Sequence, residues 1–307
     1  MFRPPYIPLS LDAVVGPQIG KNLKPIRLTP THNWAKANGA SFTESGLWLR
    51  AEWYSKKSEK KWRESVDREV ISVRNSVGFC DVSTLGKIDI QGRDAQDFIN
   101  KIYSNGFAKL PIGKVRYGLM LREDGIVMDD GTTARMSENH FIMTTTTINA
   151  ESVYRHLEFC HQCLWPKMDV HLISTTDAWA QIAIAGPNSR KVISKILDKE
   201  FDISNEKFPF MSCKELTICG GITARLFRIS FSGELAYELS LPTQYASSFV
   251  SYLMKVGKEE NIIPYGTEAL GVMRIEKGHA AGAELNGTIS ALNLNMEKMV
   301  SPQKDSI

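Results

Sequence analysis

Three carboxylates stand out because each lies in or next to a predicted turn between two apolar runs. Asp129 and Asp130 close the apolar run 126–128, and Glu234 follows a Ser-Gly pair further along the chain. A carboxylate in a cleft can accept the paired N–H donors of a heterocycle, or assist proton transfer to an amine. Turns also collect Asp and Glu because these side chains are well solvated there. From the residues alone, both interpretations stay open.

Two predicted hairpins would position these carboxylates. Alternating apolar residues over 116–121 and 126–130 flank an Asp-Gly pair, and a similar pattern over 226–231 and 235–239 flanks a Ser-Gly pair. Such dipeptides between alternating runs indicate β-hairpins. Because side chains alternate between the faces of a strand, we expect one carboxylate of the adjacent aspartates to point inward and the other outward. We expect Glu234 to lie at the corresponding hairpin of a second copy.

An internal repeat underlies that expectation. The segments KIDIQGRDAQDFINKI (87–102) and QIAIAGPNSRKVISKI (181–196) are identical at six of sixteen positions at an offset of 94 residues. Each predicts a strand, a glycine turn and a helix. A further helix is predicted after each hairpin, over Ala150–Phe159 and over 245–256. The sequence therefore predicts an α+β fold with a duplicated β-α-β-β-α unit, whose two copies face one another across a shared cleft.

Several other kinds of site are not indicated. The sequence has no GxGxxG or Walker A loop for nucleotide phosphates and no GxSxG nucleophile elbow. Its six histidines lack metal-ligand spacing, and the CxxC pair Cys160 and Cys163 lacks a second ligand pair. We therefore expect no NAD site, no metal site and a structural or incidental role for the CxxC pair.

Composition narrows the class of protein further. The chain has 307 residues, of which 43% are hydrophobic, and a net charge of +3 without a long basic run, which argues against nucleic-acid binding. No apolar window is long enough for a membrane span, and the N-terminus lacks the apolar stretch of a signal peptide. Five cysteines do not form a disulfide framework in a chain of this length. We expect a cytoplasmic protein without nucleic-acid or membrane partners.

Ordered motifs carry a family resemblance. In chain order they are VGFCDVSTLGK (77–87), RYGLML (116–121), EDG (123–125), DD (129–130), AGP (185–187), FSGELAYE (231–238) and RIEKG (274–278). With them the sequence resembles the aminomethyltransferase folate-binding family, which includes the glycine-cleavage T-protein. Four further segments are similar to the C-terminal half of the alpha subunits of heterotetrameric sarcosine oxidases: FIMTTTT (141–147), FPFM (208–211), SFSGE (230–234) and PYGTE (264–268).

The resemblance implies tetrahydrofolate chemistry. In such enzymes a flavin oxidises the N-methyl group of sarcosine, and tetrahydrofolate captures the one-carbon unit as 5,10-methylene-tetrahydrofolate. The resemblance implies that Asp129 is catalytic and that Glu234 anchors the pterin. The other residues that it implies in folate binding are Tyr117, Met120, Asp130, Tyr237 and Arg274.

The resemblance also implies partners and boundaries. FAD and FMN would be bound through partners, namely a flavin-bearing beta subunit and small gamma and delta subunits. We expect residues 1–60 to be a linker-like segment that packs on the domain. Residues 61–300 would form the folate-binding domain, with repeats at about 87–160 and 181–256. Residues 301–307 would be the truncated start of a C-terminal β-barrel that is otherwise missing.

One position departs from the family pattern. Glycine-cleavage relatives carry an arginine four residues before the position of Arg274, where this sequence has Leu270.

The sequence leaves three functions open. The chain is the folate-binding part of a sarcosine oxidase alpha subunit, a free-standing tetrahydrofolate-dependent aminomethyltransferase or demethylase, or a truncated folate-binding module without turnover.

Overall fold

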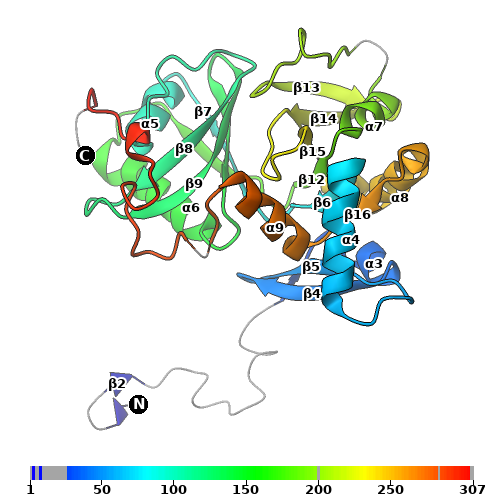
Figure 1. The fold of residues 1–307 in the computed structure, drawn as a ribbon. Coiled ribbons are helices and arrows are strands. Elements are labelled where there is room, and N and C mark those ends of the chain that lie inside the picture. The colour runs from blue at the N-terminus through cyan, green and yellow to red at the C-terminus, as the bar shows by residue number, and fades with distance from the viewer. Residues whose placement is uncertain (1, 4–6, 9–25, 199–200, 283, 305–307) are drawn as a thin grey trace.

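Two large β-sheets stand side by side, each with helices on its outer face (Figure 1). The computed structural model describes residues 2–3, 7–8, 26–198, 201–282 and 284–304. The first sheet has the order β11-β7-β10-β9-β8, with strands β7 (Gly86–Gln91), β8 (Val115–Leu121), β9 (Val127–Ser137), β10 (His140–Thr145) and β11 (His171–Ser174). The second has the order β13-β14-β15-β12-β6-β16, with strands β6 (Gly78–Asp81), β12 (Trp179–Ala185), β13 (Cys213–Ile218), β14 (Ile222–Phe227), β15 (Ala236–Pro242) and β16 (Ile263–Pro264).

The chain repeats one succession of elements, which confirms the α+β class and the internal duplication. Helices α5 (Ala95–Ile102) and α6 (Ala150–Phe159) belong to the first unit, β7-α5-β8-β9-β10-α6. Helices α7 (Ser189–Ile196) and α8 (Ala246–Val256) belong to the second, β12-α7-β13-β14-β15-α8. Each unit therefore has one strand more than the sequence pattern predicted.

The extra strand changes which hairpins correspond. The predicted strand over 226–231 is wrong, because β14 ends at Phe227 and residues 228–235 form a loop. The backbone of Arg228 instead exchanges hydrogen bonds with the 211–212 segment, at 2.9 Å to the Met211 amide and 2.8 Å to the Ser212 carbonyl. The tight hairpin at Asp124-Gly125 between β8 and β9 therefore corresponds to β13–β14, and not to the turn that carries Glu234.

The two units exchange one strand each. Strand β6 immediately precedes the first unit but pairs with β12 of the second sheet, through Ile182↔Asp81. Strand β11 precedes the second unit but pairs with β7 of the first sheet, through Leu172↔Ile90. Each sheet therefore contains a strand that precedes the unit of the other sheet in the chain.

The glycine of each repeat motif lies where the exchanged strand enters. Gly92 (φ 130°) and Gly186 (φ 125°) have backbone angles that favour glycine. An added Cβ would lie 2.0 Å from the carbonyl oxygen of Asp169 at Gly92, and 2.4 Å from that of Ser76 at Gly186. The following residues bond to the same carbonyls, from the Asp94 amide at 3.2 Å and the Asn188 amide at 3.0 Å. The motif is thus a joint between the units.

Each sheet buries its helical face in a separate core. Helix α5 buries side chains at i, i+3, i+4 and i+7, and α7 repeats this spacing; the buried residues are Ala95, Phe98, Ile99 and Ile102, and Ser189, Val192, Ile193 and Ile196. The alternating isoleucines of β7 and β12 point toward these helices, with Ile88 and Ile90 in the first core and Ile182 and Ile184 in the second.

The layer between the sheets is apolar at one end and charged in the middle. Val115, Ala134 and Ile142 of the first sheet pack against Cys213, Phe227 and Ile229 from the second half. Beside them, Arg225 lies 3.4 Å from Asp89 and its guanidinium stacks on Trp179 at 4.0 Å. Burial raises the pKa of Asp89, but His140 and Arg225 outweigh it, so the pKa lies below its usual value. The pair links the two sheets through charge as well as packing.

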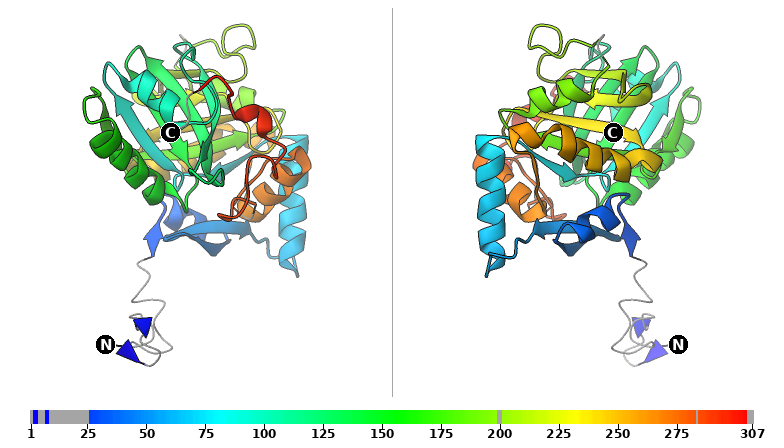
Figure 2. Two further views of the ribbon diagram at one scale, coloured as in Figure 1. Left: turned by 90° about the vertical axis from the view of Figure 1, so that its left-hand side faces the viewer. Right: turned by 90° about the vertical axis from the view of Figure 1, so that its right-hand side faces the viewer.

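A third layer covers the β6 edge of the second sheet. It contains strands β3 (Arg27–Leu28), β4 (Ala40–Ser45) and β5 (Trp48–Tyr54), with helices α3 (His32–Ala37), α4 (Trp62–Asn75) and α9 (Thr267–Lys277). Figure 2 shows the β3-β5-β4 sheet below the two large sheets, with α4 upright beside them. The buried Glu69 of α4 ties this layer together by accepting the amides of Tyr54 at 2.7 Å and Gly266 at 2.8 Å.

The described part of residues 1–60 contains regular structure where we expected a linker-like segment. Residues 26–54 form a small sheet and a helix, and Trp34 contacts Phe79 of β6 with ring centroids 5.5 Å apart. Residues 1, 4–6 and 9–25 of that segment lie outside the described residues, as do 305–307 of the expected barrel start; strands β1 (Phe2–Arg3) and β2 (Ile7–Pro8) form a separate antiparallel pair. Most prolines of residues 1–60 precede β3, so they do not interrupt the longer strands β4 and β5.

The remaining elements are short. They are the π-helical turn η1 (Cys160–Leu164) and the 3-10 turns η2 (Thr243–Tyr245), η3 (Lys258–Glu260) and η4 (Glu297–Met299). Among the described residues, every helix is too short or too polar to traverse a bilayer.

Candidate functional site

Asp129 is completely buried, and its carboxylate has three hydrogen-bond donors. Oδ1 accepts bonds from the Thr146 hydroxyl at 2.6 Å and the Asn149 side-chain amide at 3.0 Å, while Oδ2 accepts the Thr146 backbone amide at 3.0 Å. These donors come from the connection between β10 and α6. Burial raises the pKa of Asp129, although the hydrogen bonds act in the opposite direction. The carboxylate is held rigidly at the start of β9.

Asp130 points to the other face of β9 and remains half-buried. The hydroxyl of Tyr117 on β8 donates to its Oδ2 at 2.7 Å. Burial raises the pKa of Asp130 to about 6, and the negative charge of Asp129 adds to the effect. The opposite orientations of the two aspartates confirm the alternation that the sequence predicted. Tyr117 and Asp130, two of the predicted folate-binding residues, are thereby brought together.

Met120 and Tyr237 lie in the two hydrophobic cores. Met120 is opposite Asp129 in the β8–β9 register, but its side chain belongs to the buried cluster beneath α5. Tyr237 is fully buried in the second core, where its hydroxyl accepts a hydrogen bond from Arg190 of α7 at 2.8 Å. Both residues have places in the packing of their units, and the structure does not bring Tyr237 to either aspartate.

Glu234 lies in the 228–235 loop and forms an ion pair that the sequence did not predict. Nη1 of Arg74, in the last turn of α4, donates to its Oε1 at 2.8 Å and to the Ser232 carbonyl at 2.9 Å. Arg74 and Glu234 are 160 positions apart in the chain, so neither spacing nor periodicity could reveal the pair. Arg74 lies in none of the motifs or predicted elements, so the sequence offered no signal for it.

Arg274 is engaged with the segment that follows α9. Its Nη1 donates to Glu284 at 2.7 Å and to the His279 carbonyl at 3.0 Å. The His279 ring stacks on Phe231, with centroids 5.6 Å apart, and its Nδ1 lies 3.0 Å from the Phe231 carbonyl. Arg274 therefore fixes the segment around His279 beside the loop that contains Phe231 and, three residues later, Glu234.

The segment after α9 runs from the Glu234 loop to the aspartates. The Val127 amide at the start of β9 donates to the carbonyl of Ile289 at 2.9 Å, and Leu285 and Ala291 pack against Leu119 and Val127. The described residues after α9 thus contact the Glu234 loop through His279 and the start of β9 through Ile289. No direct contact between Glu234 and either aspartate occurs among the described residues.

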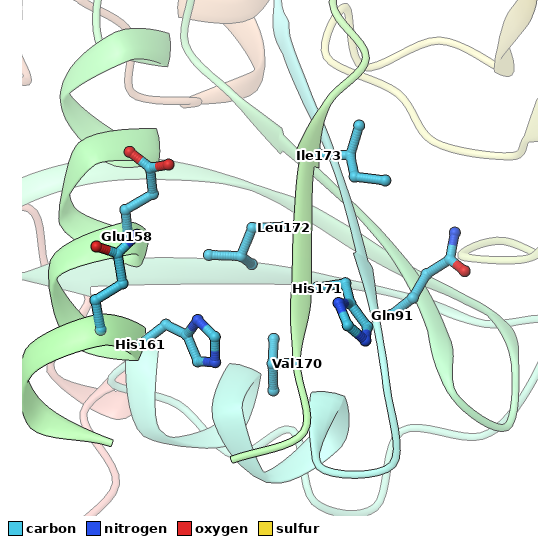
Figure 3. A pocket seen from close by; sticks show the side chains of 8 residues that line it. Gln91, Glu158, His161, Val170, His171, Leu172 and Ile173 are labelled. Carbon is cyan, nitrogen blue, oxygen red and sulfur yellow. The ribbon is translucent and has the colours of Figure 1, made fainter. Parts of the chain in front are cut away.

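A pocket on the other edge of the first sheet contains none of these residues. It has a volume of about 460 Å³ and is lined by Gln91, Glu158, His161, Gln162, Val170, His171, Leu172 and Ile173 (Figure 3). The side chains come from the end of β7, from the edge strand β11 with the residue before it, and from the end of α6 with η1. In the part of the chain that the structure describes, no cluster of His, Cys, Asp or Glu side chains is suited to a metal ion. Cys160 is buried and Cys163 exposed, and both are free thiols.

Comparison with known proteins assigns the family. Residues 31–304 match the family described as the GCVT N-terminal domain. The chain is 55% identical over 304 residues to sarcosine oxidase subunit alpha of Rhizobium meliloti (strain 1021), covering 99% of this chain and 31% of that relative. It is 30% identical over 247 residues to aminomethyltransferase of Thermoanaerobacter sp. (strain X514), covering 78% of this chain and 64% of that relative.

A solved structure agrees with this assignment at the level of the fold. Glycine cleavage system aminomethyltransferase T from Bartonella henselae superposes with a TM-score of 0.76 at 21% identity, covering 90% of this chain and 70% of that chain. The chain therefore belongs to the GCVT family, the aminomethyltransferase family that its motifs indicated. The similarity to sarcosine oxidase alpha subunits is likewise confirmed. The chain spans about a third of the length of the R. meliloti relative (31%).

Proposed function

We propose that this chain is the tetrahydrofolate-binding part of a sarcosine oxidase alpha subunit. It would capture the one-carbon unit of oxidised sarcosine as 5,10-methylene-tetrahydrofolate. The observation that carries the proposal is the 55% identity to a sarcosine oxidase subunit alpha across 99% of the chain. FAD and FMN would be held with a flavin-bearing beta subunit and small gamma and delta subunits. The five free thiols are in keeping with a cytoplasmic location.

The side chains at the carboxylate sites suit a folate. A pterin presents neighbouring N–H groups in a guanidinium-like arrangement, which a carboxylate accepts well. Glu234 has that chemistry, and its side chain is 23% exposed. Phe231, in the same loop three residues before Glu234, stacks on His279 and offers an aromatic wall. Tetrahydrofolate itself supplies the nucleophilic amines that accept the one-carbon unit.

Asp129 would accept or hold a proton beside the reacting amine. Its Oδ2 accepts one hydrogen bond and retains a lone pair, whereas Oδ1 accepts two. A carboxylate whose pKa is raised by burial is a stronger base than an exposed one. Thr146 and Asn149 would fix its orientation, so that little reorganisation accompanies the transfer.

The proposal predicts different effects for the two carboxylates. In the assembled oxidase, co-expressed with beta, gamma and delta partners, Asp129→Asn should keep folinic acid binding but depress formation of 5,10-methylene-tetrahydrofolate from sarcosine. Glu234→Ala should instead weaken binding by about 1–3 kcal/mol, because a charge-assisted pair is lost. Calorimetry and product analysis separate the two effects, and Asp97→Asn, at an exposed aspartate of α5, is the control for position 129. Unchanged transfer by Asp129→Asn would make the catalytic assignment wrong.

A free-standing aminomethyltransferase or demethylase is the second candidate. The fold shared with an aminomethyltransferase T over 90% of this chain favours it. One-carbon transfer from a lipoylated carrier protein without any flavin would support this candidate against the first. A folate-binding module without turnover is the third, and folinic acid binding with no transfer in either assay would support it.

A further inference from the structure

The guanidinium of Arg74 joins three elements at the Glu234 loop. Nη1 donates to Oε1 of Glu234 and to the Ser232 carbonyl, at 2.8 and 2.9 Å. Nη2 donates to Glu276 of α9 and lies 3.4 Å from the Met273 carbonyl. The same side chain therefore holds the loop backbone, the loop carboxylate and α9.

The two carboxylates bound to Arg74 differ in exposure. The Glu276 side chain is 53% exposed, whereas that of Glu234 is 23% exposed and that of Arg74 is 26% exposed. Glu276 is thus largely solvated. Glu234 has fewer alternatives, since Arg74 is its ion-pair partner among the described residues and engages Oε1. Among the described residues, Oε2 of Glu234 has no hydrogen-bond donor, and the bond from Arg74 to Oε1 fixes the direction in which Oε2 points.

The loop backbone is anchored on both sides of Glu234. Following it, the Leu235 carbonyl accepts the Gly186 amide at 2.9 Å and the Ser189 hydroxyl at 2.8 Å. Preceding it, the Gly233 amide donates to the Ser230 hydroxyl at 3.1 Å. With the backbone fixed, the rotamers of Glu234 are its main remaining freedom, and Arg74 restricts them. Such restriction before binding lowers the entropy lost when a ligand is bound.

We propose that Arg74 is a positioning residue for ligand recognition by Glu234. It orients the carboxylate so that Oε2 faces the paired N–H donors of the bound heterocycle. This inference rests on the proposed folate-binding function and specifies how its anchor is prepared. Arg74 acts through Glu234 and makes no contact with the ligand itself.

The test is folinic acid binding to the intact 307-residue chain, measured by calorimetry. Arg74→Ala should weaken binding about tenfold, equivalent to about 1.4 kcal/mol. Arg74→Lys should recover part of that loss, because an ammonium can keep one of the two contacts to the loop. Glu276→Gln, which alters the other carboxylate on the same guanidinium, should bind within about twofold of the unmodified chain.

A double variant separates positioning from direct contact. If Arg74 acts through Glu234, the combination R74A/E234Q should bind no more weakly than E234Q alone. Additive losses, or wild-type affinity in R74A, would overturn the inference. Should R74A fail to fold, as judged by its thermal unfolding, the comparison of R74K/E234Q with E234Q answers the same question. Absence of folinic acid binding by the unmodified chain would instead overturn the proposed function.

Discussion

The two units share a plan but differ in what covers their exchanged strands. Strand β6 of the second sheet is flanked by β16 and lies under α4, α9 and the small N-terminal sheet. Strand β11 is the edge of the first sheet, with Ile173 52% exposed. The added layer supplies Arg74, the partner of Glu234. The candidate ligand anchor therefore depends on a layer that only the second sheet has. The shared plan provides the scaffold, and the asymmetry provides the site.

The strongest way to break the comparison is to disturb the two glycine joints. Gly92→Ala and Gly186→Ala should each cost about 3 kcal/mol of unfolding free energy, because a Cβ would meet a backbone carbonyl at an unfavourable positive φ. Urea unfolding measures the loss. Gly106→Ala is the control, since its Cβ would meet nothing within 4 Å. A large effect at one joint and none at the other would mean that the units do not depend on the exchange equally.

Glu69 offers a pH-dependent test of the layer that only the second sheet has. Burial raises its pKa to about 7, so the folded protein binds a proton that the unfolded chain releases near pH 4.5. Stability from this group is therefore full at low pH and falls as pH rises from about 4.5 to 7, on the order of 3 kcal/mol.

The measurement is urea unfolding of the unmodified chain and Glu69→Gln at pH 5 and pH 7.5. Relative to the unmodified chain, Glu69→Gln should be more stable at pH 7.5 than at pH 5, because only the unmodified chain must bury an ionised carboxylate at the higher pH. Glu64→Gln, on the exposed face of the same helix, should show no such shift. Parallel pH profiles for all three proteins would contradict the assigned protonation.

The smallest expected effect sharpens the contrast between the exchanged edges. Ile173 and Cys80 hold equivalent places, since they pair with Asp89 and Ala183, which are 94 residues apart. Ile173→Ser on the open edge should change stability by less than about 0.5 kcal/mol. Cys80→Ser, which buries a hydroxyl, should cost about 1 kcal/mol. Equal effects in thermal unfolding would show that the first edge is covered in solution.

The sequence predicted local elements well where one face is apolar. The repeat motifs become β7-α5 and β12-α7, and the predicted helix Ala150–Phe159 is α6 with the same bounds. The Asp-Gly turn and the opposite orientations of Asp129 and Asp130 followed from side-chain alternation and turn chemistry. These features depend on residues that are close together in the chain.

Features that depend on distant residues were missed. The strand exchange could not be read from periodicity, because β6 and β11 fit the edge of either sheet equally well by pattern. Alternation over 226–231 suggested a strand, but pairing with the 211–212 segment turns the backbone away at Arg228. Arg74 and the donors to Asp129 were missed for the same reason. Arg274 is bound to Glu284 in this structure, and its role in folate binding stays a prediction.

The strand exchange has a consequence for synthesis of the chain. As the polypeptide leaves the ribosome, β6 emerges about a hundred residues before its partner β12. Strand β7 emerges about eighty residues before its partner β11. Neither half can close its sheet early, so unpaired edges persist until most of the chain has been made. Slow, non-local pairing of this kind exposes nascent chains to aggregation. The duplicated architecture therefore places its requirement for non-local strand pairing at the stage of chain synthesis.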